Sequence, residues 1–301
     1  MDNSIPVFSL IIPTYNRATI IIETLKSALK QTYKNYEVII VDDGSTDDTK
    51  SVVSTFINSN NLTNFHYFFK ENAERGAARN FGLSKAIGSW ISFLDSDDCL
   101  YENHFQKAYD FLKENPNTNV FHTAYEYRDD DNVLINKIVY PKNYPLNKLI
   151  LKGNIFSCFG MFIKKEITKE LKFNENRDLS GSEDWLLWLM IAARYKIILQ
   201  PIVTGKLVQH QGRSVLNFDE KKLVNRKDIL ICSLNEDVIF VKKFGKTTVK
   251  KIEAHMLTYI ALHLILNGKK AKGLNYFFKG ISVNYLEVFS LRTLAVVKHL
   301  F

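Results

Sequence analysis

The N-terminal third of the chain alternates short apolar runs with amphipathic segments. Apolar runs at 7–12, 37–41, 65–69 and 90–94 predict four strands, the first of them buried. Helical spacing between them predicts crossover helices, one of which starts at the Ser45-x-x-Asp48 pattern. Strands that alternate with helices indicate an α/β fold, a mostly parallel sheet with helices on both faces.

Polar loops follow three of these predicted strands. They begin at Pro13, Asp42 and Asp95, and the last two are acidic. In parallel sheets, ligands bind beyond the carboxyl ends of the strands, so we expect these loops to form the site. GxGxxG, GxxxxGK[ST], GxSxG and HExxH patterns are all absent, which disfavours dinucleotide binding by a glycine loop, P-loop hydrolysis, and the common serine and zinc hydrolases.

The C-terminal region has a different pattern and a different charge. Apolar positions follow helical spacing through 249–266, 274–281 and 286–297, which predicts an α-helical extension. Residues 220–301 hold 15 Lys and Arg against 6 Asp and Glu, whereas the first 219 residues hold 25 against 26. The net charge of +8 therefore lies in the C-terminal region, so we expect no nucleic-acid partner. Two interpretations stay open: helices that only pack on the body, or basic helices that also contact an anionic membrane surface.

The overall composition is that of a globular protein. The chain has 301 residues, of which 46% are hydrophobic and 24% charged. Its three cysteines, Cys99, Cys158 and Cys232, are too far apart for a disulfide framework or metal knuckle and favour a reducing compartment. The first residues do not resemble a signal peptide, and no apolar run is long enough to span a membrane. We therefore expect a cytoplasmic protein.

Asp95 and Asp97 stand two residues apart after an apolar strand. Side chains at i and i+2 of an extended segment point the same way, and two such carboxylates repel unless a proton or cation lies between them. Mg²⁺ or Mn²⁺ with a bound diphosphate satisfies this arrangement. The alternative is an acidic turn, or a helix N-cap after Leu100.

Other polar residues lie near the same predicted edge. Beside a nucleotide, Asp43 would accept the N3–H of a uracil and Tyr15 would stack on the base; the alternatives are turn chemistry with Gly44 and strand-edge packing. Arg75 and Arg79 stand at a predicted helix start, where they would contact phosphate or simply be solvated.

Four blocks in order carry a family resemblance: 10–17 (LIIPTYNR), 41–47 (VDDGSTD), 76–83 (GAARNFGL) and 93–98 (FLDSDD). The chain resembles family 2 glycosyltransferases, which have the GT-A fold. The resemblance implies a Rossmann-like domain, a nucleotide-sugar donor, usually a UDP-sugar, and transfer with inversion. It further implies that Asp95 and Asp97 bind the metal. The expected nucleotide site comprises Pro13, Thr14, Tyr15, Asn16, Arg17, Asp42, Asp43, Arg75, Arg79, Asp95 and Ser96.

The second half of the body offers candidates for the base that inverting transfer needs. Glu183-Asp184-Trp185 resembles the acidic catalytic pair of the family, which assigns Asp184 as the base, supported by Glu183; helix capping is the alternative. His210 matches a position that completes the metal site in many members, although a lone histidine is usually structural. The resemblance further implies that Gly160, Met161 and Trp185 belong to the acceptor side.

These expectations combine into one interpretation. The sequence indicates a GT-A domain over 1–218, with a nucleotide-sugar half at 1–115 and an acceptor half at 116–218, followed by a basic helical region at 219–301. The expected enzyme is peripheral on the inner face of the cell membrane and acts on a saccharide or lipid-linked saccharide acceptor. The rival classes are a nucleotidyltransferase, which would have a glycine-rich basic loop after its first strand, and a sugar-nucleotide-binding protein without a base.

Overall fold

The computed structural model describes residues 5–141, 144–209 and 219–300. Contacts between residues divide the chain into two compact units. The first falls within Met1–Leu146, Ile155–Glu175 and Tyr195–Gly212, and the second within Asn147–Asn154, Asn176–Arg194 and Arg213–Phe301. The helix α5 (Leu146–Leu149) spans the first division. The predicted domain boundary at 218 stays a prediction.

The first unit is an α/β sheet of nine strands among the described residues. The strand order is β3-β2-β1-β4-β8-β6-β9-β5, and β7 pairs with β6 alone. The strands are β1 (Phe8–Thr14), β2 (Tyr36–Asp42), β3 (Phe65–Phe69), β4 (Trp90–Phe93), β5 (Cys99–Leu100), β6 (Val120–Asp129), β7 (Leu134–Ile138), β8 (Met161–Lys164) and β9 (Ile197–Gln209). Its helices are α1 (Ile21–Leu29), α2 (Thr49–Ser59), α3 (Glu74–Lys85), α4 (His104–Glu114) and α6 (Ile167–Glu170).

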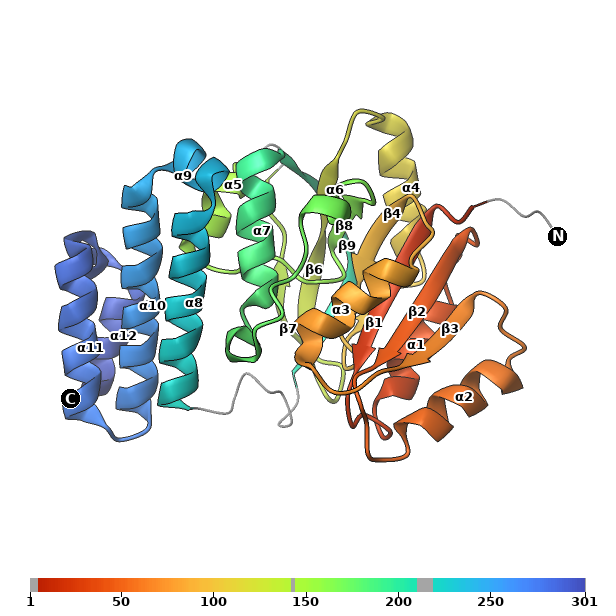
Figure 1. Cartoon of the computed structure of the whole chain (residues 1–301), viewed down its shortest axis with the longest axis horizontal. Coiled ribbons are helices and arrows are strands. Elements are labelled where there is room, and N and C mark those ends of the chain that lie inside the picture. The colour runs from red at the N-terminus through yellow and green to blue at the C-terminus, as the bar shows by residue number, and fades with distance from the viewer. Residues whose placement is uncertain (1–4, 142–143, 210–218, 301) are drawn as a thin grey trace. The chain divides into compact units, whose positions relative to one another are not determined.

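The four predicted strands form the parallel half of this sheet. β1 lies between β2 and β4, and β2 pairs with β3, all in parallel (Figure 1). Thr14 pairs with Asp42, and Asp42 pairs with Phe69, so the ends of three neighbouring strands lie side by side. The predicted α/β class is confirmed, and the polar loops after β1 and β2 emerge at one edge.

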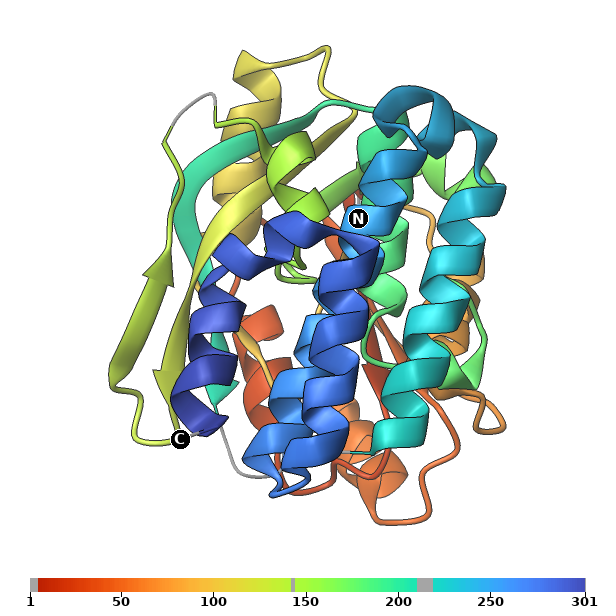
Figure 2. The ribbon, with the colours of Figure 1, turned by 90° about the vertical axis from the view of Figure 1, so that its left-hand side faces the viewer.

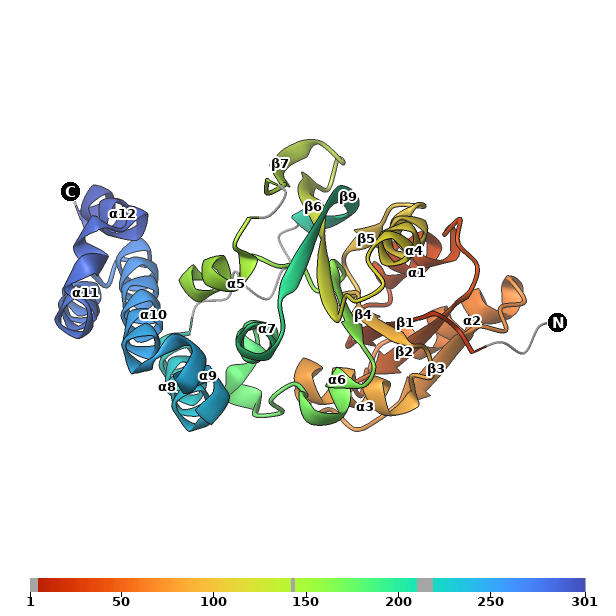
Figure 3. The ribbon, with the colours of Figure 1, turned by 90° about the horizontal axis from the view of Figure 1, so that it is seen from above.

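Helices cover both faces of this half, as the alternation of β1 requires. Leu10 and Ile12 pack in a core cluster with residues of α1, α2 and α4, whereas Ile11 faces α3. Figure 3 shows α1 and α4 on one side of the sheet and α3 on the other. A Cβ at Gly82 would lie 2.4 Å from Ile11 Cγ2, so only glycine lets α3 approach the strand this closely.

The other half of the sheet is mixed rather than parallel. β8 is antiparallel to both β4 and β6, β7 is antiparallel to β6, and only β6 and β9 pair in parallel. Parallel neighbours need a crossover connection, but β6 and β7 follow each other through a tight turn, so they must run in opposite directions. The expectation of a mostly parallel sheet therefore describes only the N-terminal half.

One predicted helix begins later than its pattern suggested. The Ser45-x-x-Asp48 pattern predicted a start at Ser45, whereas α2 begins at Thr49. The hydroxyl of Ser45 instead accepts a hydrogen bond from the Asn16 backbone at 2.9 Å. Ser45 therefore contacts the neighbouring loop instead of capping a helix. The local sequence pattern carries no information about that loop.

The second unit is helical, and α10 lies at its centre. Its elements are η1 (Ile150–Lys152), η2 (Arg177–Leu179), α7 (Glu183–Arg194), α8 (Glu220–Glu236), α9 (Val238–Phe244), α10 (Lys246–Leu266), α11 (Lys270–Val283), η4 (Tyr285–Phe289) and α12 (Leu291–Leu300). Helices α8, α10 and α11 run side by side (Figures 1 and 2). The predicted helical extension is confirmed. Within the described ranges, no helix is long and apolar enough to cross a membrane.

An ion pair joins α7 to the C-terminal helices. Both terminal guanidinium nitrogens of Arg194, Nη1 and Nη2, contact the Asp237 carboxylate, at 2.7 and 3.0 Å. Asp237 also caps α9 by accepting hydrogen bonds from the Ile239 and Phe240 backbones. Burial raises the pKa of Asp237, but the Arg194 contact and these amides outweigh it, so the net pKa is lowered.

Candidate active site

The loops after β1 and β2 are fastened to each other by hydrogen bonds. Asn16 donates its backbone N–H to Ser45 Oγ at 2.9 Å, and its side-chain oxygen accepts from the Thr46 N–H at 2.8 Å. Arg17 donates to Thr49 Oγ1 at 2.9 Å. Asn16 has φ of 51°, a left-handed conformation that asparagine tolerates better than most residues. The two loops are therefore preorganised as one surface.

Asp42 stabilises this surface through its buried carboxylate. Its carboxylate is buried, accepts a hydrogen bond from the Ser45 N–H at 2.8 Å, and accepts another from the Tyr67 hydroxyl at 2.6 Å. Burial raises the pKa of Tyr67, and the hydrogen bond to Asp42 raises it further. The phenol therefore keeps its proton and remains a hydrogen-bond donor. In this structure Asp42 orders the loop after β2.

Asp43 lies next to a cation that the sequence had not singled out. The Lys70 ammonium contacts the Asp43 carboxylate at 2.6 Å, and the Ala73 N–H donates to it at 3.1 and 3.2 Å. Lys70 directly follows β3, so it is a further residue at the carboxyl end of a strand. Ligands bind beyond the carboxyl ends of parallel strands, and this rule, applied to the end of β3, points to Lys70.

The remaining residues at the end of β1 differ in exposure. Pro13 and Thr14 are buried, and the Thr14 carbonyl accepts a hydrogen bond from the Asp43 N–H at 2.8 Å. The Tyr15 ring is 47% exposed. Close packing at the strand edge therefore does not account for Tyr15, whose side chain is available to a ligand.

Asp95 is paired with a buried arginine. Arg79 Nη2 contacts Asp95 Oδ1 at 2.6 Å, and the guanidinium lies 5.1 Å from the centre of the Phe173 ring. Arg79 is only 1% exposed, so the alternative of a solvated helix face is wrong for it. Arg75, one turn earlier on α3, is half-buried.

Asp97 is paired with the first loop. Arg17 Nη2 lies 3.7 Å from Asp97 Oδ2. Ser96 is buried between the two aspartates, and Asp98 donates its N–H to the Asp95 carbonyl at 3.1 Å. The acidic segment is therefore a turn, but not a helix cap, because α4 begins at His104 with Asn103 as its N-cap.

The donor set of this turn suits a hard divalent cation. Two carboxylates, of Asp95 and Asp97, stand two residues apart, and their side chains are 27% and 13% exposed. Mg²⁺ is typically bound by one or two carboxylates, with phosphate oxygens and waters completing its shell. Within the described part of the chain, no three His, Cys, Asp or Glu side chains are grouped as metal ligands. His210 lies outside the described residues.

The second unit holds the predicted base at the start of α7. Asp184 is half-buried; one carboxylate oxygen accepts from Asn154 Nδ2 at 2.7 Å and the other from the Trp185 N–H at 2.7 Å. Glu183 is buried and accepts a hydrogen bond from the Gly181 N–H at 2.6 Å. Glu183 therefore fixes the turn before α7, while Asn154 orients Asp184.

The residues predicted for the acceptor side are buried. Met161 is 0% exposed in β8, and the Gly160 carbonyl accepts from the Thr123 N–H at 2.9 Å. Trp185 is 6% exposed and donates its indole N–H to the Ile150 carbonyl at 2.9 Å. Their side chains contribute to the packing of their own units, and an acceptor role stays a prediction.

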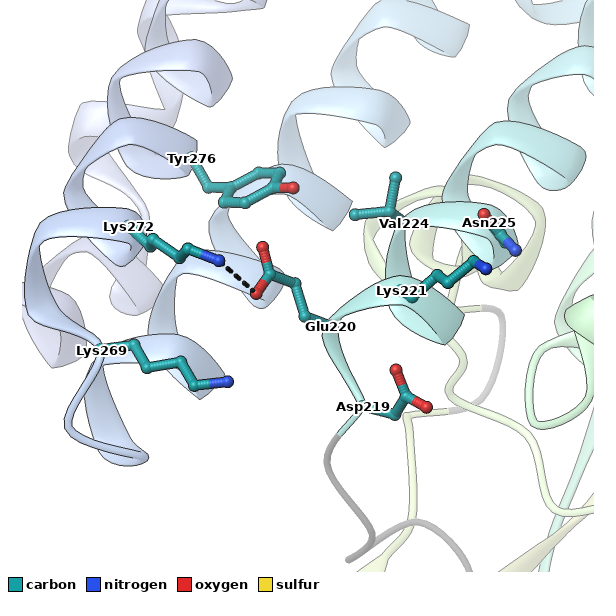
Figure 4. Close-up of a pocket in the computed structure, with 8 residues that line it drawn as sticks. All are labelled: Asp219, Glu220, Lys221, Val224, Asn225, Lys269, Lys272 and Tyr276. Carbon is teal, nitrogen blue, oxygen red and sulfur yellow. Dashed lines mark hydrogen bonds and ion pairs between the residues drawn. The ribbon is translucent and has the colours of Figure 1, made fainter.

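A separate groove of about 580 Å³ lies in the second unit, at the N-terminal ends of α8 and α11 (Figure 4). It carries both charges: Lys272 contacts Glu220 at 3.3 Å, and Asp219 caps α8 by accepting from the Lys222 N–H. The groove contains no residue predicted for the site. Its full lining is Asp219, Glu220, Lys221, Val224, Asn225, Lys269, Lys272 and Tyr276.

The geometry agrees with the comparison to known families. The profile described as glycosyl transferase family 2 matches residues 9–171, more than half of the chain. The chain belongs to glycosyl transferase family 2. All the strand-end residues described above, from Pro13 to Asp97, lie inside the matched range.

Two bacterial relatives match this chain over most of their own length. GlyG of Streptococcus pneumoniae serotype 4, named a glycosyltransferase, is 35% identical over 280 residues, which cover 84% of this chain and 91% of GlyG. TuaG of Bacillus subtilis strain 168, a glycosyltransferase named for teichuronic acid biosynthesis, is 30% identical over 62% of this chain and 73% of TuaG. In contrast, the chain spans only 31%, 30% and 26% of three longer Rickettsia relatives.

A solved structure shares the fold. The crystal structure of S. aureus TarS 1–349 in complex with UDP-GlcNAc matches 97% of this chain and 88% of that chain, with a TM-score of 0.67 and 22% identity. At this identity the likeness concerns the fold, and it confirms the predicted GT-A architecture.

Proposed function

We propose that this chain transfers a sugar, with inversion, from a UDP-linked donor to a saccharide or lipid-linked saccharide acceptor in surface polysaccharide or glycoconjugate synthesis. The observation that carries the proposal is the gathering of an exposed aromatic ring, Asp43 and the Asp95–Asp97 turn within one α/β unit. Membership of the family, the name of TuaG and the UDP-GlcNAc bound to TarS support it.

The nucleoside is assigned to the loops after β1 and β2. Tyr15 offers its exposed side chain for stacking, and the Asp43 carboxylate, which is only 3% exposed, is assigned to accept the N3–H of uracil. Pro13, Thr14 and Asn16 shape the loop, and Asp42 orders it from behind. Lys70 holds the Asp43 carboxylate in place, and we assign it as a positioning residue for base recognition.

The diphosphate is assigned to the acidic turn and the arginines around it. Asp95 and Asp97 would hold Mn²⁺ or Mg²⁺, which when bound supplies the positive charge that stabilises the departing diphosphate. Arg17 and Arg75 carry charge suited to phosphate, whereas Arg79 holds Asp95 and Ser96 packs beneath the turn. His210 remains a candidate third ligand by resemblance.

The acceptor hydroxyl loses its proton as it attacks, and we assign Asp184 as the base. Asn154 fixes one oxygen of the carboxylate, and Glu183 anchors the turn that precedes it. Gly160, Met161 and Trp185 are assigned to the walls behind the acceptor. We assign the transfer reaction to a domain over 1–218, and the basic helices of 219–301 form an extension of that domain.

The proposed place of action is the cytoplasmic face of the cell membrane. The three cysteines are free, as in a reducing compartment, and the excess of lysine and arginine lies in the C-terminal region. A lipid-linked acceptor would be presented at such a surface.

A donor screen tests the proposal. The purified chain is incubated with a panel of nucleotide sugars, and release of the nucleoside diphosphate is followed with Mn²⁺ and with excess chelator. We expect metal-dependent hydrolysis of one UDP-sugar, because many transferases allow water into the acceptor site. If no nucleotide sugar is hydrolysed but one of them binds tightly, the result would favour a sugar-nucleotide-binding protein. Release of pyrophosphate from a nucleoside triphosphate and a sugar phosphate would favour a nucleotidyltransferase.

A further inference from the structure

The short helix η4 has its polar and apolar residues reversed relative to an ordinary surface helix. Four of its five residues, Tyr285, Leu286, Val288 and Phe289, are exposed, and Phe289 is 83% exposed. The fifth residue, Glu287, is buried. Burial usually selects the apolar side chains and leaves the acid in water, so this segment needs an explanation beyond folding.

The helix α12 continues the exposed apolar surface. Leu291, Leu294 and Val297 are spaced three residues apart and are 84%, 65% and 46% exposed. Thr293 and Val296, on the other side of the helix, are buried, and Val296 packs with Ala261 of α10. We name the exposed set the η4–α12 stripe: Tyr285, Leu286, Val288, Phe289, Leu291, Leu294 and Val297.

Hydrogen bonds hold the stripe in its outward orientation. Thr258 of α10 donates to the Glu287 carboxylate at 3.4 Å, and Thr293 donates to the Glu287 carbonyl at 2.5 Å. Arg292 donates to the His255 carbonyl at 2.5 Å. Because both the buried acid and the arginine are tied to α10 or to the turn, the apolar side chains cannot rotate inward without breaking these contacts.

The surroundings of the stripe are basic. Between 269 and 300 the chain has six Lys and Arg and one acid, Glu287, which is buried. Lys270 donates to the Leu300 carbonyl at 2.8 Å, which brings the N-terminal end of α11, with Lys269, to the C-terminal end of the stripe. Lys298 lies in the last turn of α12 itself. The exposed charges within this segment are therefore all positive, and one of them, Lys272, is paired with Glu220 of α8.

We propose that the η4–α12 stripe docks this chain on an anionic lipid surface, with its apolar side chains entering the boundary between headgroups and acyl chains. Apolar side chains flanked by lysine match the chemistry of such a boundary. A second copy of the chain is less suited, since a symmetric contact would bring the same positive charges together. The inference deepens the proposed membrane location but does not depend on the transfer reaction.

The test compares vesicle binding by wild type and by the triple variant Phe289→Ser, Leu291→Gln, Leu294→Gln. The vesicles are phosphatidylcholine with or without phosphatidylglycerol, and binding is measured by flotation. We expect the wild type to bind the anionic vesicles and the variant to bind them at least about tenfold more weakly, because burial of even one large apolar side chain is worth about that factor. All three residues are exposed, so the melting temperature should be unchanged.

A matched control replaces exposed apolar residues elsewhere. Val133, just before β7, and Ile135, within β7, are 59% and 56% exposed, and Val133→Ser with Ile135→Ser should leave vesicle binding intact. UDP binding in solution, measured in parallel, should be the same for all three proteins; its absence would refute the proposed function without touching this inference. Equal vesicle binding by wild type and triple variant would overturn the inference. So would a wild-type dimer that the triple variant converts to monomer.

Discussion

Replacement of Asp95 by asparagine tests the structural role of the acidic turn, namely the pairing of Asp95 with Arg79. Asp95 contacts Arg79 at 2.6 Å, and Arg79 is 1% exposed. The guanidinium cannot simply move into water, because it lies against the Phe173 ring, and Phe173 in turn packs edge-on against Phe93 of β4. Asp95→Asn therefore leaves a buried positive charge without its anionic partner.

The size of the effect follows from these exposures. Removing one member of a fully buried ion pair costs about 3–5 kcal/mol of stability. Asp95 is 27% exposed and an asparagine oxygen still accepts a hydrogen bond from Arg79, so we expect about 1–3 kcal/mol. In a chain of 301 residues this lowers the melting temperature by about 2–10 °C.

The matched control is Asp97→Asn. The contact of Asp97 with Arg17 is longer, 3.7 Å, and the arginine side chain is 25% exposed, so the loss of stability should be smaller. Thermal unfolding followed by circular dichroism, without metal or nucleotide, gives both values. If Asp95→Asn melts with the wild type, or if Asp97→Asn is the less stable of the two, the assignment of Asp95 as the partner of a buried arginine is refuted.

Three further predictions concern Lys70, Asp184 and a pair of buried histidines. Lys70→Gln should weaken UDP binding by about tenfold in calorimetry, since Asp43 loses its ammonium partner, while turnover at saturating donor stays the same; unchanged affinity would contradict the positioning role. Asp184→Asn should lower turnover by about 10²–10⁴-fold with UDP affinity and melting temperature nearly unchanged, and a variant near the wild-type rate would transfer the assignment to Glu183. Burial lowers the pKa of both His104 and His122 to about 3, so the folded protein binds fewer protons than the unfolded chain between pH 6.5 and 3. Their contribution to stability is therefore complete above pH 6.5 and falls by about 1.4 kcal/mol per pH unit for each below it, and a denaturant midpoint equal at pH 7 and pH 5 would contradict this.

The sequence predicted the parallel half of the sheet well, because apolar residues dominate each strand there. The prediction for 65–69 coincides with β3, and the other three strands agree within two residues. The mixed half was harder to predict, although β6, β8 and β9 also contain apolar residues. Their direction depends on which neighbour each strand meets, a tertiary property that local patterns do not contain.

The sequence predicted which acidic residues belong to the candidate site, but it did not predict the ion pairs that they form. The rule on strand ends led to Asp43, Asp95 and Asp97, and the structure places each beside a cation. That Arg79 is buried against Asp95 depends on the close packing of α3, which Gly82 permits. Lys70 was missed because it stands alone after β3 without a surrounding motif.

UDP binding in the presence and absence of divalent metal tests the central claim most directly. Calorimetric titration of the wild type with UDP is carried out in Mn²⁺ and in excess chelator, and repeated with Asp97→Asn. The account predicts tight binding only for the wild type in Mn²⁺, with the chelator and the substitution weakening binding to a similar extent. Equal affinity of the wild type in Mn²⁺ and in chelator, or an Asp97→Asn variant that binds UDP as tightly as the wild type in Mn²⁺, would contradict it.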